Sequence, residues 1–425
     1  MAWPVTRLPV GARVLPPRVF YGWYVAIACS LLMLVGVGVG YYGLAVFLRP
    51  LQDEHGWSNT VVSGATGLYF SLSGITGFLV GPSVDRVGPK PFMLVGSILL
   101  ACSISLIGFV SSIWQLYVVY SVLAVAFGLA TSVSVNAVMT RWFVAKRAKA
   151  MSISSTGISV GGMVLAPTGS WLIDAGGLEL ATPLMGLLVL AGALPVILLV
   201  IVADPAHMGL AADGVVDDAS PLRGSLTDDV QRRVWSRAEA ARTREFWALL
   251  VGFGVVLTAQ TGFVIHQISF LEDRVGSRST AALALSVTAF GSIVARLVVG
   301  SFADRVDKRV LTVVLFLMQA AAVGGIVVTD NVPVTYALTL VFGFTIGNVY
   351  MMMSLLVGET FGMVSFGTVF GLVTLAGQVG SGLGPLLIGA IEDGTGGYGA
   401  AFAVTAAATA LSAIVIGIGA RPNAA

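Results

Sequence analysis

The stretch GPSVDRVGPK, residues 81–90, occurs a second time in a changed form, as GSFADRVDKR at residues 300–309. The two copies lie 219 residues apart, which is about half of the 425-residue chain. Pro167 and Pro385 keep nearly the same spacing, 218 residues. Matching landmarks at one spacing predict that the chain is built from two similar halves.

The composition is that of a membrane protein. Hydrophobic residues make up 56% of the chain and charged residues only 10%, against roughly a quarter charged in ordinary soluble domains. Apolar segments of about 20 residues recur along the chain, and each can cross a hydrocarbon core of about 30 Å as a helix. Twelve helices are expected at 23–48, 58–83, 91–110, 114–139, 148–173, 181–202, 245–271, 279–302, 310–328, 333–357, 366–391 and 399–419.

A long polar segment separates the sixth expected helix from the seventh. We therefore predict an all-α membrane protein of two pseudo-symmetric six-helix bundles. Its parts are an N-terminal tail at 1–22, an N-terminal bundle at 23–202, a central loop at 203–244 and a C-terminal bundle at 245–420.

The basic residues predict the orientation, since Lys and Arg concentrate in cytoplasmic loops. Of the 23 Lys and Arg, nineteen fall in the tails and in the loops on the side of the central loop. Three, Arg49, Arg274 and Arg278, fall on the opposite side, and Arg296 lies within a helix. Both termini and the central loop are therefore expected to be cytoplasmic, in a protein of the cytoplasmic membrane.

Several function classes lack their sequence signals. The three histidines, His55, His207 and His266, have no metal-ligand spacing, and neither a nucleophile motif nor a phosphate-binding loop is present. A basic patch with interleaved aromatic residues, which nucleic acid would need, is also missing. We therefore expect no enzyme, no cofactor, no metal and no nucleic-acid partner.

Arg296 is the cation that needs an explanation. It lies six residues before Phe302, so its backbone is expected near mid-membrane, where a charge costs at least about 2.5 kcal/mol. Asp and Glu residues fall near the ends of the expected helices and offer no counter-ion at that depth. A bound anion would supply one, since a guanidinium matches a carboxylate in bidentate geometry. The alternative is that Arg296 reaches toward the cytoplasm or bonds to backbone carbonyls.

The motif at Gly81, Asp85, Arg86, Gly88 and Lys90 resembles the signature between helices two and three of the major facilitator superfamily. The helix count, the second copy and the central loop extend this resemblance over the whole chain. Residues 21–58, residues 141–162 and the Ala295-Arg296 step look like the monocarboxylate and oxalate/formate branch of that superfamily.

In that branch the helix-eight arginine binds the substrate carboxylate, so the resemblance implies this role for Arg296. Two positions depart from the pattern of the animal monocarboxylate carriers. Ser292 stands where they have an acidic residue, and Tyr42 stands where they have a proton-binding lysine. These departures argue against proton coupling by their route.

Other polar groups on apolar helices are candidates to line a central pathway. They are Tyr41, Tyr42, Tyr69, Asn136, Asn348 and Gln378. His266, near the end of helix seven and about one and a half turns before Glu272, is a candidate coupling residue because histidine can titrate near neutral pH. For each of these residues the alternative is a hydrogen bond between helices.

The charged motifs suggest a cytoplasmic gate. Asp85 is expected to pair with Arg141, and Glu359 with Arg305 or Arg309, while Gly81 and Gly88 permit close approach and a tight turn. The alternative is that these charges only anchor loops. The full set expected at the gate is Gly81, Asp85, Arg86, Gly88, Lys90, Arg141, Asp304, Arg305, Arg309 and Glu359.

The leading hypothesis is a monomeric secondary transporter that moves a small organic anion across the bilayer by alternating access, driven by protons or a counter-anion. The alternative is an exporter of drugs or other apolar compounds, in which Arg296 is structural. A test of anion transport separates the two.

Overall fold

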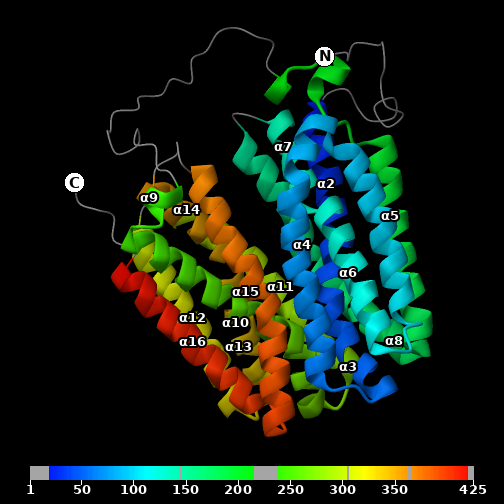
Figure 1. Ribbon diagram of the computed structural model, residues 1–425, viewed down its shortest axis with the longest axis vertical. Helices are drawn as coiled ribbons and strands as arrows, with labels where there is room; N and C mark the ends of the chain where they lie inside the picture. Colours follow the sequence, from blue (N-terminus) through cyan, green and yellow to red (C-terminus); the bar gives the residue numbers. More distant parts are fainter. Residues whose placement is uncertain (1–18, 144–145, 215–236, 304–305, 362–365, 420–425) are drawn as a thin grey trace. The chain divides into compact units, whose positions relative to one another are not determined.

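The computed structural model describes residues 19–143, 146–214, 237–303, 306–361 and 366–419. Within these ranges the regular structure is entirely helical, as predicted. Ten of the helical stretches there are long and apolar enough to cross a membrane. Figure 1 labels these helices and colours them along the chain.

The N-terminal half contains seven α-helices and one π-helical segment among its described residues. They are α2 (Tyr21–Val37), the π-helical segment Gly38–Tyr42, α3 (Gly43–His55), α4 (Asn59–Val87), α5 (Pro89–Ile107), α6 (Ile113–Ala130), α7 (Ser132–Trp142) and α8 (Arg147–Leu199). The central segment carries short 3-10 turns at Pro205–Met208 and Ala212–Gly214.

The C-terminal half contains eight helices in the part of the chain that is described. They are α9 (Arg237–Ala240), α10 (Arg244–Val275), α11 (Arg278–Phe302), α12 (Lys308–Val328), α13 (Val332–Ile346), α14 (Val349–Phe361), α15 (Phe366–Thr395) and α16 (Tyr398–Gly419).

The expected twelve membrane crossings follow from these elements. The 53 residues of α8 are two helices, because the backbone leaves the helical conformation at Gly176 and Gly177. This divides the ten long stretches of the described chain into eleven, and α4, 29 residues long, is the twelfth.

Two expected helices are interrupted, which the sequence did not predict. Helix four, which consists of α6 and α7, is broken at Thr131, whose φ of −103° and ψ of −119° are not helical. Helix ten, which consists of α13 and α14, keeps helical angles at Gly347 but has a tighter turn there, since the N–H of Asn348 bonds to Thr345 three residues earlier. Thr131 and Gly347 are 216 residues apart, close to the repeat spacing. Both halves therefore depart from regular α-helical hydrogen bonding at the same place.

Hydroxyl groups support the backbone at the break in helix four. Thr131 Oγ1 donates to the carbonyl of Phe127 at 2.6 Å, and Ser134 Oγ donates to the carbonyl of Leu129 at 2.6 Å. Side-chain donors of this kind make a broken helix tolerable away from water.

Each half also contains a contact between a basic side chain at the start of one helix and a backbone carbonyl at the end of another. Lys90 Nζ, at the start of α5, donates to the carbonyl of Ile201 at 2.9 Å, just beyond the end of α8. Arg309 Nη1, at the start of α12, donates to the carbonyl of Gly417 at 3.4 Å, near the end of α16. Each cation thus binds carbonyls where the dipole of a helix is negative.

Contacts group the chain into two units, each described here by itself. The first comprises residues 1–50 and 72–221, and the second comprises residues 51–71 and 222–425. In the first, α2 packs along α8, where Gly157 and Gly161 allow the backbones to touch. In the second, α10 packs against α15 and α16, and α11 packs against α13 (Figure 1).

Gly88 is expected to resist substitution, whereas Gly81 in the same motif is not. Gly88 joins α4 to α5 at a φ of +96° and a ψ of 155°, a conformation that costs other residues about 1–3 kcal/mol. A Cβ on Gly81 would meet no described atom within 4 Å. The close approach expected at Gly81 is therefore not made by any described residue.

We predict that Gly88→Ala lowers the melting temperature of the purified protein in detergent and that Gly81→Ala does not. Alanine in place of a helical glycine is neutral or mildly stabilising. A melting temperature for Gly88→Ala equal to that of Gly81→Ala would contradict the prediction.

Candidate functional site

Arg296 lies on α11 and contacts the break in helix ten. Its side chain is half-buried, and Nε donates to the carbonyl oxygen of Gly347 at 3.3 Å. A guanidinium has five N–H donors, so this bond uses one of them. From the sequence, a bond to a backbone carbonyl was the alternative to a bound anion. That bond is present, and it joins Arg296 to the turn in helix ten.

Small residues bring α11 and helix ten into backbone contact. A Cβ on Gly347 would lie 2.5 Å from the carbonyl oxygen of Ser292, and a Cβ on Gly291 would lie 2.6 Å from that of Leu340. Such distances leave no room for a side chain, so glycine is required at both positions. Arg296 lies one helical turn beyond Ser292 and is carried to the break by this contact.

Asn348 completes the polar surface at the break. It is fully buried, and its Nδ2 donates to the carbonyl of Phe344 at 3.1 Å, four residues earlier. Its Oδ1 is buried without a hydrogen bond to any described residue. Arg296 and Asn348 are thus the two predicted substrate residues that the structure brings to one feature of the second unit.

The remaining predicted substrate residues are more dispersed. In the first unit, Tyr42 is buried in the π-helical segment, and a Cβ on Gly162 would lie 2.6–2.8 Å from its ring, while Asn136 is exposed on α7. In the second unit, Tyr69 is fully buried with its ring 5.1 Å from that of Phe70, and Gln378 is half-buried on α15.

His266 is held by several groups and does not contact Glu272 through a described bond. It is fully buried, and its ring nitrogens face Ser63, the carbonyl of Pro385 and the hydroxyl of Tyr398. Glu272 instead pairs with Arg278 at 3.4 Å.

The first half of the expected gate has Arg141 beside its motif. Arg141 Nη2 donates to the carbonyl of Val84 at 3.3 Å, and Gly88 provides the tight turn. The side chain of Asp85, its expected partner, lies outside the described residues. Arg86 is exposed, and Lys90 binds a helix end.

The second half of the gate differs from the expectation. Glu359 pairs with Lys308, at 2.9 Å, and Arg309 is bound to the carbonyl of Gly417. The pairing of Glu359 with Arg309 was therefore wrong, because successive residues at a helix start point in different directions. Asp304 and Arg305 lie outside the described residues.

Sequence reasoning also missed polar groups in the second unit. Gln260 on α10 is buried, and its Oε1 has no hydrogen bond to a described residue. Asn59, at the start of α4, bonds to Glu392 and to Tyr398. Gln260 could have been found as an amide inside an apolar run, whereas the bonds of Asn59 depend on which helices touch.

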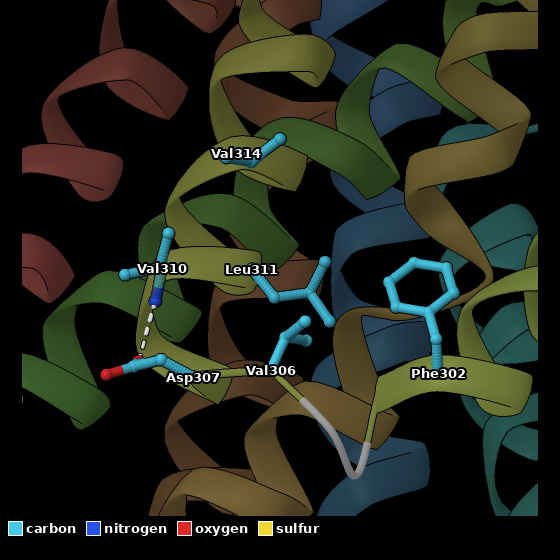
Figure 2. Close-up of a pocket in the computed structure, with 6 residues that line it drawn as sticks. All are labelled: Phe302, Val306, Asp307, Val310, Leu311 and Val314. Carbon is cyan, nitrogen blue, oxygen red and sulfur yellow. Dashed lines mark hydrogen bonds between the residues drawn. The ribbon is translucent and has the colours of Figure 1, made fainter.

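A surface groove between α11 and α12 does not suit a polar ligand. It has a volume of about 310 Å³ and is lined by Val306, Val310 and Val314 among others, and Figure 2 shows Leu311 of α12 pointing toward Phe302 of α11. Its carboxylate, Asp307, accepts the backbone N–H of Val310 at 3.0 Å and caps α12. The groove is otherwise apolar, as expected of a surface in contact with lipid.

Membrane helices arranged in two repeated halves are typical of secondary transporters. The sequence model of the Major Facilitator Superfamily matches residues 28–385 and 262–424. The chain therefore belongs to this superfamily and is an integral membrane transporter rather than an enzyme.

Known proteins point to one branch of the superfamily. The chain is 27% identical over 400 residues to monocarboxylate transporter 13 of Bos taurus, covering 93% of this chain and 88% of the relative. It is 25% identical over 235 residues to the oxalate:formate antiporter of Oxalobacter formigenes, covering 54% and 51%.

A solved structure shares the fold. It is a bacterial homolog of the human lysosomal transporter Spinster, in an inward-facing and unoccupied conformation. It matches with a TM-score of 0.69 and 19% identity, over 94% of this chain and 95% of that one. The predicted superfamily, branch and fold are thus confirmed.

The contact between α11 and helix ten is expected to be intolerant of a single methyl group. Gly347→Ala would place its Cβ against the carbonyl of Ser292 and displace the break that Arg296 contacts. Overpacking of this kind costs about 1–3 kcal/mol. We predict a lower melting temperature in detergent for Gly347→Ala.

Gly371→Ala is the matched control, since a Cβ on Gly371 would meet no described atom within 4 Å. An unchanged melting temperature for Gly347→Ala would mean that the two helices are not in backbone contact.

Proposed function

We propose that this protein is a secondary transporter that moves a small organic anion by alternating access, with Arg296 as the anchor for the substrate carboxylate. The observation that carries the proposal is the position of Arg296 against the interrupted helix ten. Relatives named as monocarboxylate transporters and an oxalate:formate antiporter support this class of substrate.

The geometry supports an anion at this place for a physical reason. A carbonyl oxygen offers Arg296 a partial negative charge, whereas a carboxylate carries a full one, and full charges interact more strongly inside a membrane protein than in water. A carboxylate would compensate that charge. It would also accept two parallel hydrogen bonds from the guanidinium.

Asn348 is the second residue that we place at the substrate. Its Nδ2 is bound to Phe344, and its buried Oδ1 can accept a hydrogen bond, for instance from a substrate hydroxyl. Tyr42, Tyr69, Asn136 and Gln378 are retained in the proposal as residues that line the pathway. The burial of Tyr42 and Tyr69 agrees with packing roles as well.

The cytoplasmic gate is proposed in a revised form. Arg141 lies beside the peptide that precedes Asp85, which supports the pairing of these two residues. In the second half, Lys308 and Glu359 take the place of the expected pair. Side chains exposed by 18% and 43% form a wet ion pair, worth about 1 kcal/mol or less, which can break in each cycle.

We further propose that the protein resides in the cytoplasmic membrane as a monomer, with both termini in the cytoplasm. The distribution of Lys and Arg supports this orientation. Protons or a counter-anion would drive transport.

Uptake of labelled lactate, pyruvate, acetate and oxalate into proteoliposomes tests the proposal. We expect uptake of at least one of these anions by the unmodified protein. Arg296→Ala should lower it by at least about tenfold, because charge-assisted hydrogen bonds contribute about 1.5–3 kcal/mol. Arg296→Lys should restore it only in part, since an ammonium group lacks the bidentate geometry.

Arg242→Ala is the matched control, because Arg242 is exposed outside the long apolar helices. It should transport at the rate of the unmodified protein. Equal uptake by Arg296→Ala would show that the arginine is structural, and export of apolar compounds would then be the reading to test.

A further inference from the structure

A partly buried polar cluster joins four helices of the second unit. It lies near the C-terminal end of α10, away from the central segment that precedes α10. Its members come from the start of α4, the last third of α10, the end of α15 and the start of α16. We call it the outer cluster, and it consists of Asn59, Thr60, Ser63, His266, Glu392, Asp393 and Tyr398. The charge distribution predicts that this end is extracellular.

Two carboxylates of α15 hold the start of α4. Asp393 accepts the backbone N–H of Asn59 at 3.1 Å and that of Thr60 at 2.7 Å. Glu392 accepts a bond from the side-chain amide of Asn59 at 2.8 Å. The first N–H groups of a helix have no partner within the helix, and an anion is stabilised beside them. Helix α4 is therefore capped twice, by Ser58, whose Oγ accepts the N–H of Val61 at 3.3 Å, and by Asp393 of α15.

The hydrogen bonds around His266 define its protonation state. The carbonyl oxygen of Pro385 can only accept, so Nε2, at 3.0 Å from it, must carry a hydrogen. Ser63 Oγ, 3.2 Å from the same nitrogen, donates its own hydrogen to Asn59 Oδ1 at 3.0 Å. Nδ1 then accepts from the hydroxyl of Tyr398, 3.4 Å away. Every hydrogen has a place when the imidazole is neutral.

The outer half of α4 also packs closely on α15. A Cβ on Gly389 would lie 3.0 Å from Cβ of Ser63, and a Cβ on Gly67 would contact the carbonyl oxygen of Gly382. Small residues one turn apart therefore let the two backbones touch, as at other helix contacts in membranes. The outer cluster closes one end of this contact.

A charged imidazole would fit the cluster badly. A proton on Nδ1 would oppose the hydrogen that Tyr398 donates, and the ring is completely inaccessible to water. Among the described residues no carboxylate bonds to His266, since Glu392 and Asp393 are bound to α4 and Glu272 to Arg278.

The groups that face the imidazole from α4, Asn59 and Ser63, do not titrate in the physiological range. On α10 itself the nearest acidic residues are Glu272 and Asp273, more than a turn away. An imidazolium ion is therefore better accommodated after the contact has opened to water.

We propose that the outer cluster is a proton-binding latch. With His266 neutral, it holds the outer half of α4 against α10, α15 and α16, and a proton bound by His266 releases α4. The latch goes beyond the anion site, because none of its residues is placed at Arg296. Exposed Asp393 and half-buried Glu392 provide the aqueous end through which a proton would enter.

A buried cysteine can report the opening. Thr66 is fully buried on α4, and among the described residues its hydroxyl bonds to the carbonyl of Val62 in its own helix. We would replace Cys29 and Cys102, the two native cysteines, by alanine and introduce Thr66→Cys. The alkylation rate by a membrane-impermeant maleimide would be measured in proteoliposomes without substrate, between pH 7.5 and pH 5.5.

The same cysteine is introduced into a His266→Gln chain. Dividing the two alkylation rates removes the pH dependence of the alkylation reaction itself. We expect the ratio of the two rates, His266 over His266→Gln, to rise at least about threefold on acidification, because one linked proton changes an equilibrium by up to tenfold per pH unit. A ratio that does not change with pH would overturn the proposal. Failure of anion uptake would leave this readout unaffected.

A second pair of variants keeps His266 in place. Asp393→Asn removes the charge that caps α4 and should raise the alkylation rate at pH 7.5 at least about threefold. Asp330→Asn is the control, because the Asp330 side chain is fully exposed and 3.8 Å from Arg274. Equal rates for these two variants would show that the cluster does not hold α4.

Discussion

The hydrogen bond from Arg296 to the carbonyl of Gly347 is the interaction on which the site depends. A guanidinium does not lose its proton in a protein. Its position on an apolar helix therefore requires polar groups at the same depth in the membrane. The break in helix ten supplies that surface, and the glycines between α11 and α13 bring it within reach. The glycine contact between the two helices, the turn in helix ten and the charged side chain of Arg296 therefore depend on one another.

The repeat clarifies which features are architectural and which are specific to one half. Both halves break the same helix, and both use a cation at the start of one helix to bind carbonyls at the end of another. The break in helix four is supported by hydroxyl groups of its own chain segment. The break in helix ten contacts Arg296 instead, so the second half carries the charge that can meet a ligand.

Much of the fold could be predicted, because membrane helices are recognised in a sequence by the length and hydropathy of their apolar segments. The repeat spacing and the motif at residues 81–90 led to the superfamily, and the family match confirmed it. The break at Thr131 could not be predicted, since neither glycine nor proline marks it. Gly81 was expected to allow a close contact, but the structure places no described atom near it.

The candidate site was predicted only in part, for a related reason. Arg296 and Asn348 stood out as polar residues on apolar helices, and the structure brings both to one break. The partners of His266 were not predicted, because they come from three other helices whose contacts the sequence does not reveal. Arg309 rather than Lys308 was predicted as the partner of Glu359, because the direction of a side chain at a helix start depends on where that helix begins.

The most direct measurement is an experimental structure of the protein bound to an anion that it transports. A carboxylate bound by two N–H groups of Arg296, at about 2.7–2.9 Å, is the predicted result. Asn348 should lie beside the same ligand. An anion bound elsewhere, with Arg296 still bonded to the carbonyl of Gly347, would contradict the assignment of Arg296 as the substrate anchor.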